Sequence, residues 1–141
     1  MGRSISHSLG FMDELTPILV VDDEPLVRLA MIEALQGGGY RVIEAVDGSA
    51  AIEHIEGAEQ LRGLVTDIRM PGADGWEVAH RARKKFPVLA IVYVTGDSAH
   101  DWSANGVPQS TVLQKPFADA EIVTALANML VAQQPPPQSD C

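Results

Sequence analysis

Short apolar runs alternate along this chain with segments that have the periodicity of amphipathic helices. Strand-length apolar runs with helical patterns between them are typical of a parallel sheet covered by helices on both faces. The sequence predicts strands at about 17–22, 41–45, 63–66, 88–94 and 110–114. It predicts helices after Pro25 and at about 49–57, 75–85, 98–104 and 118–131. The repeated βα order predicts a doubly wound α/β fold, for which right-handed crossovers leave few topologies.

The first predicted helix has one core face and one candidate surface. It begins at Pro25, behind an aspartate that can cap it, and the glycines at 37–39 end it. Residues at i, i+3, i+4 and i+7 form the predicted core face: Val27, Ala30, Met31 and Ala34. At about 100° per residue, Leu29 and Ile32 point roughly opposite to that face, so we expect both to be exposed.

Composition excludes several classes of protein. The chain has 141 residues and a net charge of −9, without a basic patch, so we expect one domain and no direct binding of nucleic acid. The only cysteine is Cys141, so no internal disulfide can form, as is usual in a reducing cytoplasm. No apolar run approaches the roughly 20 residues of a membrane span, so we expect no membrane insertion.

Both ends differ in composition from the middle of the chain. Residues 1–15 lack a clear period, and 133–141 read QQPPPQSDC. Such segments do not pack a core. We therefore expect a flexible N-terminal extension at 1–15, a folded domain at 16–132 and a disordered Pro-rich tail at 133–141. A tail of this length has no room for a DNA-binding module of about 50 residues, so we expect a single-domain protein.

Acidic residues end two of the predicted strands. Asp22 and Asp23 follow the first apolar run, and Asp67 follows the third. The carboxyl ends of parallel strands share one edge, where ligands bind, so we expect these carboxylates to converge. A hard cation such as Mg²⁺ prefers oxygen ligands and would relieve their repulsion. Lys115, after the fifth run, could pair with a phosphoryl group, so the set suggests phosphoryl transfer.

Each of these residues also has an ordinary explanation. Asp23 could cap the first helix, and Asp67 could be a turn residue. Lys115 and Pro116 could form a solvated turn, and Thr95 could simply end the fourth strand. The joint occurrence of these residues at the carboxyl ends of strands one, three, four and five favours a functional site.

Four segments carry a resemblance to a known family: VVDDEP (20–25), VTDIRMPGADGWE (65–77), VTG (94–96) and KPF (115–117). In this order they resemble a response-regulator receiver domain, the phospho-acceptor module of two-component signalling, over about residues 16–132. The resemblance implies a flavodoxin-like (βα)₅ fold with strand order 2-1-3-4-5. It also implies a cytoplasmic signalling protein that catalyses only the phosphorylation and dephosphorylation of its own aspartate.

The resemblance assigns a role to each residue of the acidic edge. It implies that Asp67 is the phospho-acceptor nucleophile and also a metal ligand. Asp23 would bind Mg²⁺ directly, Asp22 would act mainly through a bound water, and the backbone carbonyl of Arg69 would be a further ligand. Mn²⁺ could replace Mg²⁺.

Three further residues complete the set that the resemblance implies. Thr95 would be the switch hydroxyl that turns toward the phosphoryl group. Lys115 would pair with a phosphoryl oxygen, and the Lys115–Pro116 bond would be cis. This is chemically reasonable, because a carboxylate is a weak nucleophile and the protein's task is positioning and charge neutralisation.

The chain departs from the family pattern at two places. Many receivers carry an aromatic residue three positions before the lysine, which swings inward on activation, but here this position is Val112. Tyr93 lies nearby, and we interpret it as a strand-packing aromatic. The stretch between Thr95 and Lys115 is short, so we expect an abbreviated fourth helix. Residues 101–108 resemble stand-alone receivers of alphaproteobacterial type, for which we expect a monomer or weak dimer.

The resemblance implies a sensor histidine kinase or histidine phosphotransferase as phosphodonor, and a downstream protein partner. We expect the donor to dock on the first helix through Leu29 and Ile32. A phosphorelay shuttle or phosphate sink is the alternative, and a degenerate scaffold is disfavoured by the complete set. A phosphohydrolase is disfavoured because Arg69 stands where such enzymes need an acid. Arg69 and Asp97 could form an ion pair at the rim of the site, or each could be solvated independently.

Overall fold

The computed structural model describes residues 16–133 and contains one parallel five-stranded sheet. The strand order is β2-β1-β3-β4-β5, which confirms the predicted doubly wound topology. Each strand begins and ends within two residues of its predicted limits. The strands are β1 (Ile18–Val21), β2 (Val42–Ala45), β3 (Gly63–Asp67), β4 (Ala90–Thr95) and β5 (Thr111–Gln114).

Helices follow the strands where the sequence predicts them. They are α2 (Pro25–Gly37), α3 (Gly48–Gly57), α4 (Gly75–Lys85), α5 (Trp102–Asn105) and α6 (Asp119–Gln133). Asp47 and Asp74 cap α3 and α4, since their carboxylates accept hydrogen bonds from backbone N–H groups in the first turns. The fourth helix of the family pattern is abbreviated, as expected: a 3₁₀ turn at Ala99–Asp101 precedes the four-residue α5.

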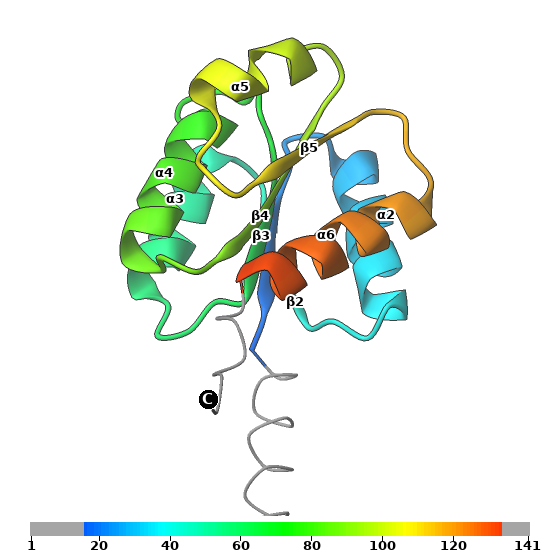
Figure 1. Cartoon of the computed structure of the whole chain (residues 1–141), viewed down its shortest axis with the longest axis horizontal. Coiled ribbons are helices and arrows are strands. Elements are labelled where there is room, and N and C mark those ends of the chain that lie inside the picture. The colour runs from blue at the N-terminus through cyan, green and yellow to red at the C-terminus, as the bar shows by residue number, and fades with distance from the viewer. Residues whose placement is uncertain (1–15, 134–141) are drawn as a thin grey trace, which may run out of the picture.

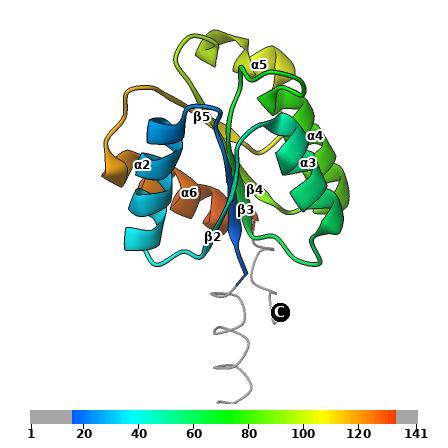
Figure 2. The same ribbon diagram turned by 180° about the vertical axis from the view of Figure 1, so that it is seen from behind.

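The helices form two layers, one on each face of the sheet (Figures 1 and 2). Helices α2 and α6 cover one face, and α3 and α4 cover the other. This explains why β1, β3 and β4 are buried along their whole lengths, because both faces of a central parallel strand are covered. The carboxyl ends of the strands lie at the top of Figure 1, at the edge where the sequence predicts the site.

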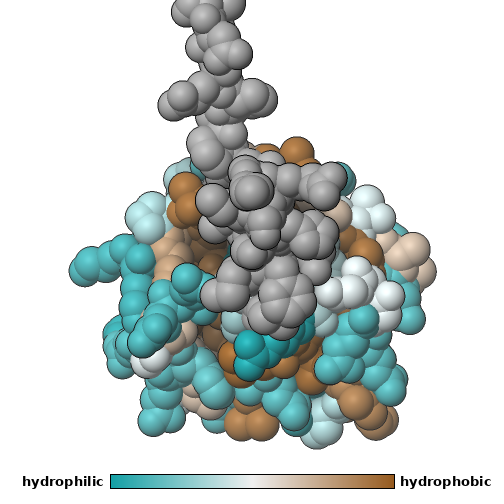
Figure 3. All heavy atoms as spheres, turned by 90° about the horizontal axis from the view of Figure 1, so that it is seen from below, coloured by the Kyte–Doolittle hydropathy of each residue, from teal (hydrophilic) through white to brown (hydrophobic). Residues whose placement is uncertain are grey.

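The opposite end of the molecule, where the strands begin, is seen in Figure 3. Hydrophobic and hydrophilic residues are interspersed over the coloured part of this end. Within residues 16–133, no helix is both long enough and apolar enough to cross a membrane. The expectations for residues 1–15 and 134–141 lie outside the described residues, whereas Gln133 belongs to α6 rather than to a tail.

The core face of α2 differs from the predicted one. Met31 and Ala34 are buried and Val27 is partly buried, as predicted, but Ala30 is exposed and Leu35 is buried in its place. The prediction for Ala30 was wrong because the helix is rotated toward Leu35. At about 100° per residue, this rotation moves the buried stripe away from position 30.

The same rotation corrects the prediction for Ile32. This side chain is partly buried and packs against the core between α2, α6 and the sheet, so it is not freely exposed. Ile32 lies only about 60° around the helix from Leu35. Arg28, one turn earlier on the same side, is also turned inward and forms an ion pair with Glu44 of β2 at 2.9 Å. Leu29 is 51% exposed, as predicted.

Tyr93 packs within the sheet layer, as predicted. Its side chain is fully buried, and its ring lies against Trp76 of α4 with the ring centroids 4.7 Å apart. Its hydroxyl oxygen accepts a hydrogen bond of 3.1 Å from the backbone N–H of Val107. Burial raises the pKa of this phenol. Tyr93 therefore fixes the segment between α5 and β5, and Val112 lies beside it in the neighbouring strand.

Candidate functional site

Three strands bring Asp22, Asp67 and Lys115 together at one edge of the sheet. The Lys115 ammonium Nζ lies 3.0 Å from Asp22 Oδ2 and 3.5 Å from Asp67 Oδ2. Asp22 is fully buried and Asp67 is nearly so. The Lys115–Pro116 peptide bond is cis. The predicted convergence of these two carboxylates and one ammonium group is therefore confirmed, although the residues lie up to 93 positions apart in the sequence.

The backbone around Asp67 is tightly constrained. Asp67 Oδ1 accepts a hydrogen bond of 2.8 Å from the Ile68 backbone N–H, which fixes the orientation of the carboxylate. The N–H of Gly75, at the start of α4, donates to the Ile68 carbonyl at 2.8 Å. A Cβ atom at position 75 would lie 2.2 Å from the Asp67 carbonyl oxygen, so only glycine allows this approach. The end of β3 and the start of α4 therefore hold Asp67 in place from both sides.

Burial and neighbouring charge perturb both titratable groups. Burial, together with the charge of Asp22, raises the pKa of Asp67 to about 6, although Lys115 and the Ile68 N–H act in the opposite direction. Burial opposes the charged form of Lys115, but the hydrogen bond and charge of Asp22, with Asp67 and Glu24, outweigh it and raise the Lys115 pKa. Lys115 is therefore protonated at neutral pH and can neutralise an anion.

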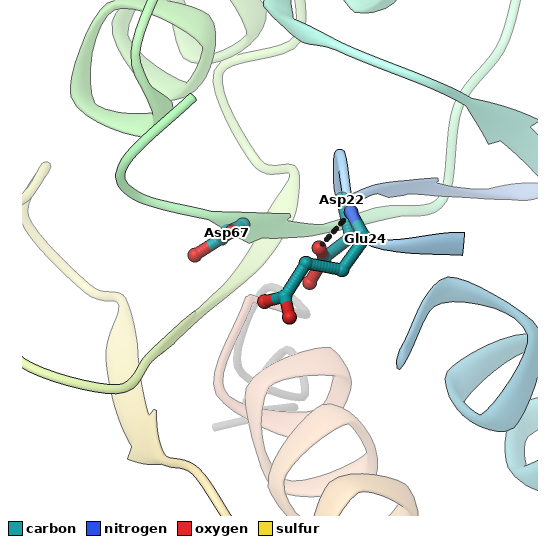
Figure 4. Close-up of side chains that lie close together, drawn as sticks. All are labelled: Asp22, Glu24 and Asp67. Atoms are coloured by element: carbon teal, nitrogen blue, oxygen red, sulfur yellow. Dashed lines mark hydrogen bonds between the residues drawn. The ribbon is translucent and has the colours of Figure 1, made fainter. Parts of the chain in front are cut away.

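Glu24 is a member of the site that the sequence did not point to. Its carboxylate joins those of Asp22 and Asp67 in a group in which one oxygen atom from each residue lies within 4.8 Å of the other two (Figure 4). Glu24 Oε1 also lies 3.2 Å from Lys115 Nζ. Asp23, the predicted direct metal ligand, is exposed and lies outside this group, although its charge contributes to the raised pKa of Asp67.

A second network joins the loops that follow β3 and β4. The Thr95 hydroxyl is buried and accepts hydrogen bonds from the backbone N–H groups of Ser98, at 3.0 Å, and Asp97, at 3.3 Å. Ser98 Oγ accepts a bond of 2.8 Å from Arg69 Nε and donates one of 3.0 Å to Asp97 Oδ1. The predicted Arg69–Asp97 ion pair forms, at 3.2 Å. Ser98, which the sequence did not single out, thus connects the predicted switch hydroxyl to Arg69.

The donor set fits a hard divalent cation. Asp22, Glu24 and Asp67 offer only oxygen ligands, and Lys115 is the one cation that forms ion pairs with their carboxylates within residues 16–133, since Arg28 donates to the backbone carbonyl of Asp22. Three carboxylates against one ammonium leave excess negative charge when all are ionised, and a divalent cation would neutralise it. Mg²⁺ is suited to such a site because it is held by one or two carboxylates and keeps several waters.

A groove beside the site separates α2 from the segment after β5. Its volume is about 310 Å³, and its lining is mostly apolar: Leu26, Val27, Ala30, Met31, Ala34, Lys115, Pro116, Phe117, Asp119 and Ile122.

Leu26, which was not predicted as a surface residue, is 81% exposed. Together with Leu29 it forms an exposed apolar pair on the first turns of α2, next to the acidic edge.

Comparisons with known proteins agree with this geometry. Residues 18–127 match the family model of the response regulator receiver domain. The chain is 34% identical over 117 residues to the response regulator receiver protein CpdR of Brucella abortus, an alignment that covers 82% of this chain and 97% of that protein. Several other curated relatives are longer, and the chain spans between 13% and 55% of their lengths.

Solved structures give the same result. A response regulator receiver protein from Sinorhizobium medicae superimposes with a TM-score of 0.82 at 39% identity, covering 86% of this chain and 98% of that one. The response regulator TrrA of Thermotoga maritima, solved in complex with Mg²⁺ and BeF, superimposes with a TM-score of 0.70 at 31% identity, covering 81% and 98%. From the family match, the shared fold and the convergence of Asp22, Asp67 and Lys115, the chain belongs to the receiver-domain family of two-component signalling.

Proposed function

We propose that this protein accepts a phosphoryl group on Asp67 from a phosphohistidine of a sensor histidine kinase or histidine phosphotransferase, and that Mg²⁺ is required. One observation carries the proposal: a nearly buried carboxylate, fixed by the Ile68 N–H, lies beside a protonated lysine and two further carboxylates at the sheet edge. This set combines a nucleophile, a positive charge for the incoming group and a site for a divalent cation.

The chemical step is a displacement at phosphorus. A carboxylate oxygen of Asp67 forms a bond to phosphorus while the bond between phosphorus and the imidazole nitrogen breaks. The electron pair stays on that nitrogen, which takes a proton from solvent if it needs one. A phosphoryl group on Asp67 would lie close to Lys115, whose ammonium can offset its negative charge.

A divalent cation bound by Asp22 and Asp67, with Asp23 and the Arg69 carbonyl as further candidates, would supply additional charge neutralisation. The protein's own residues supply the orientation. Ile68 and Gly75 hold the Asp67 backbone and carboxylate, and Asp22 holds the Lys115 ammonium in the site. These positions exist before the donor arrives, so little reorganisation is needed during transfer.

The proposed output begins at Thr95. Its hydroxyl is engaged by the N–H groups of Asp97 and Ser98, so turning it toward a phosphoryl group on Asp67 would break these bonds. The loop at 96–98 would then change its contacts with Arg69. We infer that phosphorylation alters the surface around this loop and the carboxyl ends of β4 and β5, where a downstream protein partner would bind.

The proposed docking surface for the donor is the start of α2 with the adjacent groove. Leu26 and Leu29 are exposed there, and Phe117 lines the far side of the groove. Burying such apolar residues would stabilise a complex by roughly 25 cal/mol per Å² before association costs. The proposed docking residues are therefore Leu26 and Leu29. Ile32, which the sequence suggested, is left out because it packs against the core.

A role as phosphorelay shuttle or phosphate sink is the second candidate. It is favoured by Val112, which stands where many receivers have the aromatic that swings inward, and by Tyr93, whose hydroxyl is already engaged by Val107. The two roles differ in reversibility. A shuttle would pass its phosphoryl group on to a histidine phosphotransferase, whereas a terminal switch would lose it mainly to water.

Intact-mass measurement tests the proposed function. A small acyl-phosphate donor with Mg²⁺ should add one phosphoryl group to the wild type and none to Asp67→Asn, because an amide is a far poorer nucleophile. Asp119→Asn removes an exposed carboxylate near Lys115 and is the matched control, which should still be phosphorylated. Wild-type labelling of Asp67→Asn would disprove the assignment of the nucleophile.

A further inference from the structure

Glu24 occupies the cap position of α2 but does not cap the helix. Its backbone is extended, Pro25 follows it, and its side chain makes no capping hydrogen bond. Glutamate is not among the residues preferred at this position, which are Asn, Asp, Ser, Thr and Gly. Its side chain instead reaches Lys115, which lies 91 positions away in sequence. The N–H of Glu24 donates to Asp22 Oδ1 at 2.9 Å, which fixes the backbone from which this side chain extends (Figure 4).

Lys115 has as many carboxylate partners as its ammonium has N–H donors. The three partners are Asp22 at 3.0 Å, Glu24 at 3.2 Å and Asp67 at 3.5 Å. Asp22 and Asp67 are held in the protein interior, with side-chain exposures of 0% and 8%. The Glu24 side chain is 62% exposed, so it can leave Lys115 and be hydrated by water. Glu24 is therefore the partner that an incoming anion can displace most readily.

We propose that Glu24 is a positioning residue that holds Lys115 before phosphorylation and competes with the phosphoryl group for it. This inference rests on the proposed function of Asp67 and Lys115 and adds a role for a residue outside that set. Lys115 would exchange its contact with Glu24 for one with a phosphoryl oxygen. Glu24 would thereby weaken the phosphorylated state relative to the resting state and keep Lys115 in place while the site is free of phosphate.

Binding of a phosphoryl mimic tests this exchange. Beryllofluoride with Mg²⁺, the combination in the related Thermotoga structure, is titrated into the protein in a calorimeter. Glu24→Gln removes the charge, and Glu24→Asp keeps the charge but shortens the side chain by one methylene. Both variants should bind beryllofluoride about three- to fivefold more tightly than the wild type, the upper range for loss of an exposed ion pair. Tightening in Glu24→Asp separates the ion pair from a change in net charge.

Two controls isolate the contact with Lys115. Asp119→Asn removes a carboxylate that lines the groove together with Lys115 but does not contact it. This variant should change the affinity by no more than about twofold, as expected for a surface change. In a Lys115→Met background, Glu24→Gln should no longer tighten binding. Equal tightening in both backgrounds would show a general charge effect and would overturn the inference.

A metal-free measurement provides an independent readout. The NMR signals of the Lys115 side chain should shift in Glu24→Gln and stay unchanged in Asp119→Asn, because only the first variant loses a contact with the ammonium. If Glu24 were instead a metal ligand, Glu24→Gln would weaken Mg²⁺ binding equally with and without Lys115, which would also refute the proposal. Failure of the wild type to bind beryllofluoride would contradict the proposed function, whereas unchanged affinity in both Glu24 variants would contradict only this inference.

Discussion

Arg69 and Asp97 form an ion pair of 3.2 Å that joins the loop after β3 to the loop after β4. Both side chains are about two-thirds exposed, so the pair contributes only about 0–1 kcal/mol to stability. The position of the ion pair matters more than its stability, because Ser98 connects the pair to the Thr95 hydroxyl: the Ser98 hydroxyl accepts from Arg69, and the Ser98 backbone N–H donates to Thr95. The pair therefore lies at the rim of the site and connects the acceptor loop with the loop of the switch residue.

The first prediction is that this pair slows hydrolysis of the phosphorylated protein. Arg69→Ala and Asp97→Ala should each raise the rate of dephosphorylation by about two- to fivefold, the range set by an exposed pair, because water then reaches the site more easily. The double mutant should be no faster than the faster single mutant. Rates are measured by intact mass after removal of the donor. Strict additivity of the two effects would show that the residues act independently.

The second prediction is that Mg²⁺ stabilises the protein. At 100 times its dissociation constant, the ion should add roughly 2.7 kcal/mol to the free energy of unfolding. Asp23→Asn should reduce the Mg²⁺-dependent rise in melting temperature if Asp23 is a ligand, even though it is exposed without the ion. Glu53→Gln on α3 removes the same charge far from the site and is the control. An identical rise in wild type and Asp23→Asn would exclude Asp23 as a ligand.

The third prediction concerns pH in the absence of metal. The Asp67 pKa is about 6 in the folded protein and 3.8 as its ordinary value, so between these values the folded state holds a proton that the unfolded state has lost. Stability then falls as pH rises through this window, by on the order of 2–3 kcal/mol at most. Asp67→Asn lacks this loss, and it should gain stability relative to wild type between pH 4 and pH 7.

Chemical denaturation at several pH values measures this difference, with Asp119→Asn as a control for removal of an exposed carboxylate. Parallel pH profiles for wild type and Asp67→Asn would contradict the raised pKa. Adding Mg²⁺ should diminish the difference, because a bound cation favours the ionised carboxylate in the folded protein.

The fourth prediction tests the docking surface. Leu26→Glu combined with Leu29→Glu should lower the rate of phosphotransfer from the cognate kinase by about tenfold or more, because two apolar contacts are lost and charges enter the interface. Labelling by a small acyl-phosphate donor should stay at the wild-type rate, because the chemistry is elsewhere. Val88→Glu changes a comparably exposed residue before β4 and is the control. A normal rate with the kinase would place the docking surface on another face.

Much of the fold follows from local features of the sequence. Strand and helix limits could be predicted because apolar periodicity acts over only a few positions, as do the caps that Asp47 and Asp74 form in the structure. Asp67 and Lys115 were predicted to converge because the carboxyl ends of parallel strands must meet at one edge, whatever the details of packing. The strand order came from the family resemblance, not from the residues alone.

Tertiary packing decided the final rotation of α2 and the partners of several polar side chains. The rotation of α2 buries Leu35, partly buries Ile32 and leaves Ala30 and Leu26 exposed, and it depends on how the helix packs on the sheet and α6. Glu24 reaches Lys115, and Ser98 reaches Arg69, only because loops distant in sequence end side by side. Periodicity defines a helix and its approximate apolar face, but contacts between elements fix the final rotation and the partners of polar side chains, and these contacts exist only in the folded protein.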